Sequence, residues 1–252
     1  HPLIGDLPVQ TIDTASVLKV LEPIWTTRSE TATRVRARIE SVLDWAATHG
    51  YRRGENPARW RGHLQNLLPK RSRVKRVQHY AALPFKEMPA FMVDLRGEDS
   101  VPARALEFTI LTAARSGEAL GARWSEIDLE AGVWAIPAER MKSGAEHRVP
   151  LSAPALAILT KMRGLNETFV FPGSRSRRPL TDKMARDVLV KLDRAGLTVH
   201  GFRSSFRDWA GECTAFPRDL AEMALAHTVG DDTERAYRRG ELIVKRRERM
   251  DA

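Results

Sequence analysis

The protein has 252 residues and a mass of 28.4 kDa, which suits one large domain or two modest ones. Its 41 Lys and Arg residues outnumber 32 Asp and Glu residues and give a net charge of +9, which indicates a polyanionic partner. No uncharged apolar run approaches the ~20 residues of a spanning helix, and no signal peptide opens the sequence, so a membrane protein is not expected. The single cysteine, Cys213, excludes an internal disulfide and a cysteine-based zinc site, and we expect a buried thiol in a reducing compartment.

The positive charge is concentrated in one segment. Residues 34–80 contain 12 basic and 3 acidic residues, a net +9, whereas residues 1–33 carry a net −2 and residues 81–252 a net +2. A solvated helix face is one explanation of such a block. Aromatic residues between the arginines favour DNA binding instead, because cations neutralise phosphates while aromatic rings pack or stack. The residues expected to contact DNA are Arg34, Arg38, Arg52, Arg53, Lys70, Arg71, Arg73, Lys75 and Arg76.

The first 78 residues are predicted to form a small helical domain. Asp13 or Thr14 can cap a helix that runs to Leu21, and Ser29 can cap a longer helix that ends at Gly50. Asn56-Pro57 supplies a cap and a first-turn proline for a third helix. The expected core residues of the second and third helices are Val35, Ile39, Val42, Leu43, Ala46, Leu64, Leu67 and Leu68.

Residues 79–252 are predicted to form a second domain, mainly helical with one small antiparallel sheet, so the fold class is mainly α with a small β-sheet (α+β). Three prolines punctuate residues 81–102, and an apolar helix follows over 103–114. Two short strands, near 132–137 and 147–151, are joined by a turn at Ser143-Gly144. Further helices are expected at 153–163, 181–195 with Thr181 as cap, 202–212, 217–226 and 231–248.

Several kinds of enzyme lack their motifs here, since the sequence has no Walker loop, no His-Glu zinc helix and no nucleophile-elbow serine. What remains is a set of cationic and imidazole groups with one tyrosine. Each has an ordinary explanation when taken alone: a cation suits the end of an apolar helix, a lysine on a turn is usually solvated, and a histidine on an Ala-Leu-rich helix is often in the core. The candidate catalytic residues are Arg115, Lys142, His200, Arg203, His227 and Tyr237.

Taken together, in this order and spacing, these residues resemble the catalytic set of the tyrosine recombinases, the phage-type integrases of prophages and genomic islands. The resemblance covers about residues 80 to 250, and the basic helical segment 1–78 looks like the core-binding domain of that family. The motifs are Thr112-Ala113-Ala114-Arg115-Ser116-Gly117-Glu118, Glu139-Arg140-Met141-Lys142-Ser143-Gly144, His147-Arg148-Val149-Pro150-Leu151-Ser152, His200-Gly201-Phe202-Arg203, Leu225-Ala226-His227 and Arg235-Ala236-Tyr237.

The resemblance implies site-specific DNA recombination, the integration or excision of a mobile element, through a 3′-phosphotyrosyl intermediate. Tyr237 would be the nucleophile, and Arg115 and Arg203 would hold the nonbridging phosphate oxygens. Lys142 would protonate the leaving 5′-oxygen, His200 would exchange a proton with the tyrosine, and His227 would hydrogen-bond the phosphate. Glu118 is expected to hold Arg115 by an ion pair. Because Arg and Lys take the place of metal ions, no metal and no other cofactor is expected.

The implied partners are double-stranded attachment-site DNA, further copies of the chain in a tetramer on DNA, and DNA-bending and directionality proteins. The implied location is the cytoplasm of a bacterial host, with the nucleoid. Relatives usually carry an N-terminal arm-binding domain that is missing before His1, so a truncated chain is expected. The chain ends 15 residues after Tyr237. Residues 241–250 are either part of a helix exchanged between protomers or a solvated end, so tetramer assembly stays open.

Two other functions remain as alternatives. A catalytically decayed DNA-binding fragment of an integrase would bind DNA in a salt-sensitive way and form no covalent product. A type IB topoisomerase-like enzyme shares the tyrosine chemistry, but it would relax plasmids that lack any attachment site.

Overall fold

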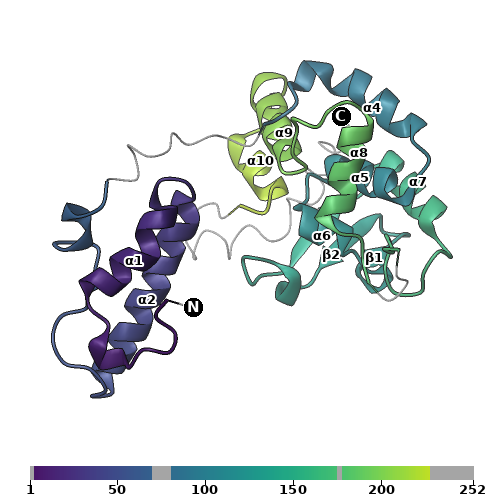
Figure 1. Cartoon of the computed structure of the whole chain (residues 1–252). Coiled ribbons are helices and arrows are strands. Elements are labelled where there is room, and N and C mark those ends of the chain that lie inside the picture. The colour runs from purple at the N-terminus through teal and green to yellow at the C-terminus, as the bar shows by residue number, and fades with distance from the viewer. Residues whose placement is uncertain (1–2, 70–80, 175–177, 228–252) are drawn as a thin grey trace. The chain divides into compact units, whose positions relative to one another are not determined.

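The computed structural model describes residues 3–69, 81–174 and 178–227. The chain forms two compact units, an N-terminal unit of residues 1–79 and a C-terminal unit of residues 80–252 (Figure 1). The described part is mainly helical and contains one small antiparallel sheet, as the sequence predicts. None of the described helices is long and apolar enough to cross a membrane.

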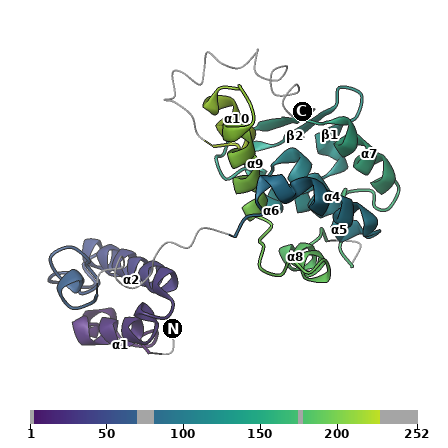
Figure 2. The same cartoon turned by 90° about the horizontal axis from the view of Figure 1, so that it is seen from above.

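The N-terminal unit is built on two helices that pack side by side, α1 (Thr14–Trp25) and α2 (Ser29–Thr48) (Figures 1 and 2). Of the two candidate caps it is Asp13 that caps α1, and its carboxylate accepts a hydrogen bond of 2.8 Å from the main-chain N–H of Ser16. The helix continues past Leu21 to Trp25 because these two side chains, one turn apart, are both buried. Short 3₁₀ helices at Val9–Thr11 and Leu64–Asn66 complete the unit.

Three predictions for this unit were wrong. Ser29 is the first residue of α2 and its N-cap is Arg28, which makes no side-chain capping bond. Residues after Asn56 form turns and one 3₁₀ helix rather than a third α-helix. Gly62 interrupts the chain there with a φ of +73°, a left-handed conformation that no α-helix contains. Val42 and Leu67, expected in the core, are 61% and 54% exposed.

In the C-terminal unit, α5 (Val101–Thr112) is the central helix. It packs against α4 (Met88–Gly97), α6 (Ser116–Leu120), α7 (Ala153–Met162) and α8 (Asp182–Lys191). Ser100 caps α5, and eight of the helix's 12 residues are buried, which is the pattern of a helix inside a core. Helices α9 (Gly201–Glu212) and α10 (Arg218–Ala224) lie side by side in both views (Figures 1 and 2).

The sheet has the strand order β1-β2-β3, with β1 at Ile127–Asp128, β2 at Val133–Ile136 and β3 at His147–Pro150. Strands β2 and β3 are the predicted hairpin, paired so that Trp134 faces Val149 across the ladder. The ring of Trp134 is fully buried and packs against Phe108 of α5, with ring centroids 5.3 Å apart. The hairpin is therefore fixed to the helical core, and its connecting loop projects from a rigid base.

The C-terminal unit differs from prediction at four points. Helix α4 is not predicted by the sequence, since Pro89 suggests a break, but this proline occupies the first turn of the helix, where proline is well tolerated. The short strand β1 was missed as well. Thr181 lies at the N-cap of α8 but makes no side-chain capping bond. Cys213 is exposed at the end of α9 rather than buried. The predicted helix at 231–248 lies outside the described residues.

Candidate active site

Arg115 lies between α5 and α6 and is held by a carboxylate from its own segment. Helix α5 ends at Thr112, and its C-cap residue Ala113 has a φ of 49° that turns the chain, so that Arg115 becomes the N-cap of α6. The Glu118 carboxylate accepts hydrogen bonds from the Arg115 main-chain N–H (3.0 Å) and from Nη1 (2.8 Å). Nη2 donates to the main-chain oxygen of Ala226 at 3.2 Å. Arg115 therefore lies beside two helix ends, and the C-terminus of α5, which favours a cation, is opposed there by the N-terminus of α6.

Arg203 is the most enclosed of the five candidate catalytic residues that the structure describes, with only 6% of its surface exposed. It lies in the first turn of α9. Its Nη1 donates to the Ala113 carbonyl at 2.5 Å, and its Nη2 donates to the Leu225 carbonyl at 2.6 Å. Burial, and secondly the charge of Arg115, lower the pKa of Arg203 to about 10. The guanidinium therefore still carries its positive charge at neutral pH.

His227 follows α10 and contacts two charged residues through its two ring nitrogens. Nη2 of Arg203 lies 3.2 Å from Nε2, and a carboxylate oxygen of Glu222 lies 2.6 Å from Nδ1. Ala226, the residue before His227, has a φ of 49°, the same left-handed conformation as Ala113. The carbonyls of these two alanines each accept a hydrogen bond from one of the arginines, Ala113 from Arg203 and Ala226 from Arg115.

His200 lies at the N-cap of α9, one turn before Arg203, and is exposed. Its pKa is lowered from the ordinary value of 6.5, mainly by partial burial of the ring and further by the positive charges of Arg203 and Arg115. The neutral form, which can accept a proton, is therefore favoured at neutral pH. The structure thus brings together four of the predicted residues, Arg115, His200, Arg203 and His227, from α6, α9 and the segment after α10.

Lys142 lies on the loop that joins β2 to β3 and is exposed. The turn is closed by a hydrogen bond of 3.1 Å from the Gly144 N–H to the Met141 carbonyl, and Gly144 has a φ of +68°. Met141 is buried and anchors this end of the loop. Within the described part of the chain, no hydrogen bond or ion pair joins Lys142 to the four grouped residues. Tyr237 lies outside the described residues.

Residues 82–241 match the Phage integrase family, and residues 1–63 match the Phage integrase central domain. The chain belongs to the phage integrase family. Prophage integrase IntA of Escherichia coli K12 is 31% identical over 99% of this chain, and Prophage integrase IntZ of the same strain is 32% identical over 99%. The chain spans 60% and 61% of these two relatives.

The fold is also that of solved integrases. A lambda integrase dimer bound to a COC' core site superposes with a TM-score of 0.65 at 19% identity, over 90% of this chain and 83% of that one. The Tn1549 transposon integrase in complex with circular intermediate DNA gives a TM-score of 0.64 at 13% identity, over 98% and 87% of the two chains. At these identities the likeness establishes the shared fold of this integrase-family chain.

The cations proposed to contact DNA divide into two groups in the N-terminal unit. Arg38 and Arg53 are exposed, and no ion pair or hydrogen bond engages them among the described residues. Arg34 forms an exposed ion pair with Glu30, 3.3 Å long. Arg52 has a structural contact instead, because its Nη1 donates to the carbonyls of Val9 and Ile12. The remaining candidates, Lys70, Arg71, Arg73, Lys75 and Arg76, lie outside the described residues.

Two residues near the site were given no role by the sequence. Arg140 donates from Nη2 to the Glu118 carbonyl at 2.7 Å, and its Nη1 pairs with the buried carboxylate of Glu126. It thereby joins the Lys142 loop to α6. Glu222 binds His227, but the two are five residues apart, which is not a regular helical spacing. For Arg140 the sequence did offer a signal, because this residue belongs to the motif around Lys142. For Glu222 it offered none.

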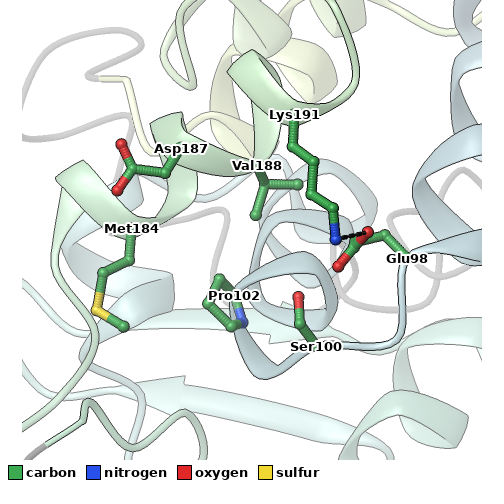
Figure 3. Close-up of a pocket in the computed structure, with 7 residues that line it drawn as sticks. All are labelled: Glu98, Ser100, Pro102, Met184, Asp187, Val188 and Lys191. Carbon is green, nitrogen blue, oxygen red and sulfur yellow. Dashed lines mark ion pairs between the residues drawn. The ribbon is translucent and has the colours of Figure 1, made fainter.

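A shallow pocket of about 220 Å³ lies elsewhere in the C-terminal unit, between α8 and the start of α5 (Figure 3). On one side Lys191 of α8 extends to Glu98, and the two form an ion pair of 2.6 Å. Met184, Pro102 and Val188 contribute apolar lining to the pocket. None of the five candidate catalytic residues that the structure describes lines it, so the pocket is separate from the residues grouped around Arg115 and Arg203.

Proposed function

We propose that this chain cleaves and rejoins double-stranded DNA at specific sites, and so integrates or excises a mobile element through a 3′-phosphotyrosyl intermediate. The observation that carries the proposal is the grouping of two guanidinium groups and two imidazoles around the left-handed turns at Ala113 and Ala226. Such a group of donors is suited to a phosphodiester, whose nonbridging oxygens gain charge during displacement. Membership of the phage integrase family supports the same chemistry.

Arg115 and Arg203 would hold the nonbridging oxygens of the scissile phosphate. Each guanidinium has five N–H donors. The hydrogen bonds to Glu118 and Ala226 occupy two donors of Arg115, and those to Ala113, Leu225 and His227 occupy three of Arg203. Within the described part of the chain this leaves donors on both groups for a ligand. The main-chain contacts fix the guanidinium planes before DNA arrives, which is the preorganisation that phosphoryl transfer requires.

Tyr237 would attack the phosphorus atom through its phenolic oxygen. The new bond joins that oxygen to phosphorus, and the bond from phosphorus to the 5′-oxygen breaks. His200 would accept the phenolic proton, for which its lowered pKa makes the neutral ring available, and Lys142 would give a proton to the leaving 5′-oxygen. Because the phosphotyrosyl bond retains the energy of the phosphodiester, a 5′-hydroxyl of another strand reverses the step without ATP or a metal ion.

DNA would be bound by both units, with residues 1–78 as the core-type DNA-binding domain and residues 79–252 as the catalytic domain. Two solved relatives support this, a lambda integrase dimer on a core site and a lambda integrase tetramer on a Holliday junction. We therefore propose attachment-site DNA as the substrate and a tetramer of this chain as the assembly that acts on it. DNA-bending and directionality proteins are the proposed accessory partners, and the bacterial cytoplasm, with the nucleoid, is the proposed location.

The test is a covalent trap. The DNA beside the coding region, searched for a tRNA gene and a direct repeat, supplies the attachment-site sequence. The chain is mixed with a duplex of that sequence nicked near the scissile bond, and the products are separated under denaturing conditions. We expect a protein–DNA adduct that is lost in Tyr237→Phe. An adduct that survives this substitution contradicts the assignment.

The same experiment separates the alternatives. Salt-sensitive binding without adduct in any condition would identify a decayed DNA-binding fragment. Relaxation of a supercoiled plasmid that lacks the attachment site would identify a topoisomerase-like activity.

A further inference from the structure

We propose that Glu222 is a positioning residue that fixes the tautomer and the orientation of His227 for contact with the scissile phosphate. The inference rests on the proposed function and adds to it a residue that lies outside the candidate catalytic set. Glu222 is on α10, with 15% of its side chain exposed, and its carboxylate meets His227 Nδ1 at 2.6 Å. His227 Nε2 in turn meets Arg203 Nη2 at 3.2 Å. The side chains of Glu222, His227 and Arg203 thus form a chain of two successive polar contacts, from the carboxylate through the imidazole to the guanidinium.

The partners at the two ends of the imidazole determine where its proton lies. An arginine guanidinium is only a donor, so a ring that accepts from Arg203 at Nε2 must carry its proton at Nδ1. A carboxylate is an acceptor and takes that Nδ1 proton. Glu222 is ionised at neutral pH: although partial burial opposes it, the hydrogen bond from His227 and the charge of Arg207 lower the pKa of Glu222 overall. The contacts therefore select the Nδ1-protonated ring.

This arrangement has a direct use when DNA binds. A nonbridging phosphate oxygen only accepts hydrogen bonds, so His227 must then offer an N–H at Nε2. With Nδ1–H bound to Glu222, Nε2 is the nitrogen left to face the phosphate, and the carboxylate would stabilise the positive charge of a ring that carries a proton on both nitrogens. Without Glu222 only the longer contact with Arg203, at 3.2 Å, restrains the ring. We then expect the ring to rotate more freely, and when it turns away from Arg203 either nitrogen can carry the single proton.

A purely structural role for Glu222 is the competing explanation, because Arg207 Nε of α9 lies 2.9 Å from its other carboxylate oxygen. Such an ion pair would hold α10 against α9 whether or not His227 is present. The two roles are separable, since Arg207→Gln removes the ion pair and leaves the bond between Glu222 and His227.

The first test reads the tautomer directly and does not require activity. The ring ¹⁵N shifts of His227 are measured in the free chain and assigned by their loss in His227→Asn. We expect the Nδ1-protonated form in the wild type, in Arg207→Gln and in Glu222→Gln, whose amide oxygen still accepts from Nδ1. In Glu222→Ala we expect a mixture with the Nε2-protonated form. An unchanged tautomer in Glu222→Ala overturns the proposal.

The second test is a double-mutant cycle on the rate of adduct formation. We expect Glu222→Ala to slow the wild type by ~10–100-fold, taking as a guide the effect of losing a carboxylate that orients a metal-binding histidine. In the His227→Ala background the same change should have almost no effect, since the residue acts through the ring. Glu222→Gln should lose less than Glu222→Ala, and Glu212→Gln, an exposed carboxylate on α9, should match the wild type.

The outcomes distinguish the two proposals. An equal loss from Glu222→Ala in both backgrounds shows a structural role only. If the wild type forms no adduct, the proposed function fails, while the tautomer measurement still decides whether Glu222 orients His227.

Discussion

Arg140 donates a hydrogen bond of 2.7 Å to the main-chain carbonyl of Glu118, and this contact joins the loop that carries Lys142 to the helix that holds Arg115. The other arm of the guanidinium pairs with the Glu126 carboxylate, which also accepts from the indole N–H of Trp134 at 3.0 Å. One buried network therefore connects two parts of the candidate site that are far apart in sequence. Its loss should affect both stability and cleavage.

Arg140→Gln is expected to destabilise the C-terminal unit by about 3 kcal/mol or more, because Glu126, with 5% of its side chain exposed, would lose its counter-charge. Hydrogen exchange at the amides of β2 and β3 measures this loss locally, and adduct formation should slow as the Lys142 loop loosens. Arg148→Gln on the same hairpin is the control, since that arginine is exposed. Equal protection in both variants would show that the network contributes nothing to the hairpin.

Arg203→Lys is expected to slow covalent cleavage by ~10²–10³, the usual effect of losing one donor to a developing oxyanion. A lysine keeps the charge, but its single nitrogen cannot reach the carbonyls of Ala113 and Leu225 and the phosphate together. Single-turnover adduct formation measures the rate, and a gel-shift titration should show little change in non-covalent affinity. Arg207→Lys, one turn further along α9, serves as the control. A rate within a few-fold of the wild type would remove Arg203 from the proposed phosphate clamp.

The elements predicted correctly are those whose signal is local. The periodicity of α5 and the alternation of the hairpin strands, with Gly144 at the turn, were sufficient because core packing reinforces them. The third helix after Asn56 failed because the left-handed Gly62 outweighs an apolar spacing that otherwise suits a helix. Helix α4 could not be recognised from its proline, because the same residue is compatible with a break and with the first turn of a helix.

The site could be predicted only as a set of side chains. Order and spacing indicated Arg115, His200, Arg203 and His227, and the structure does bring these four together. The main-chain oxygens that orient the arginines could not be predicted, since the Ala113 carbonyl and Arg203 are 90 residues apart. The two arginines reach these oxygens because Ala113 and Ala226 adopt the left-handed conformation, which a sequence pattern normally indicates only at glycine.

His200 should titrate below the ordinary value of 6.5, because partial burial and the charges of Arg203 and Arg115 lower its pKa in the folded state. Below about pH 6.5 the unfolded chain then binds the proton more readily than the folded one, so the free energy of unfolding falls as the pH falls. NMR titration of the His200 ring measures the midpoint, and Arg115→Gln should raise it. Urea unfolding at pH 7 and pH 5 should show a smaller decrease for His200→Gln. A midpoint at or above 6.5 would contradict the expectation.

Arg52 and Arg53 are neighbours in sequence but should respond oppositely to the same substitution. Arg52 donates to the carbonyls of Val9 (2.9 Å) and Ile12 (2.7 Å), so Arg52→Gln should cost the N-terminal unit ~1.5–3 kcal/mol of unfolding free energy, the usual worth of hydrogen bonds to a charged group. Arg53 is exposed, and Arg53→Gln should leave the unfolding free energy within ~0.5 kcal/mol of the wild type.

DNA binding should show the reverse order for the same pair. If Arg53 contacts a phosphate, Arg53→Gln makes the negative slope of log K against log salt shallower by ~0.9. We expect the same of Arg38→Gln on α2. Arg52→Gln should leave the slope unchanged in conditions where the variant is folded, because its guanidinium is already engaged by the main chain. Fluorescence anisotropy on an attachment-site duplex across a salt series makes the comparison. A shallower slope for Arg52→Gln with no loss of stability would mean that this arginine leaves its carbonyl partners to bind DNA. An unchanged slope for Arg53→Gln would mean that its exposed charge is only solvated.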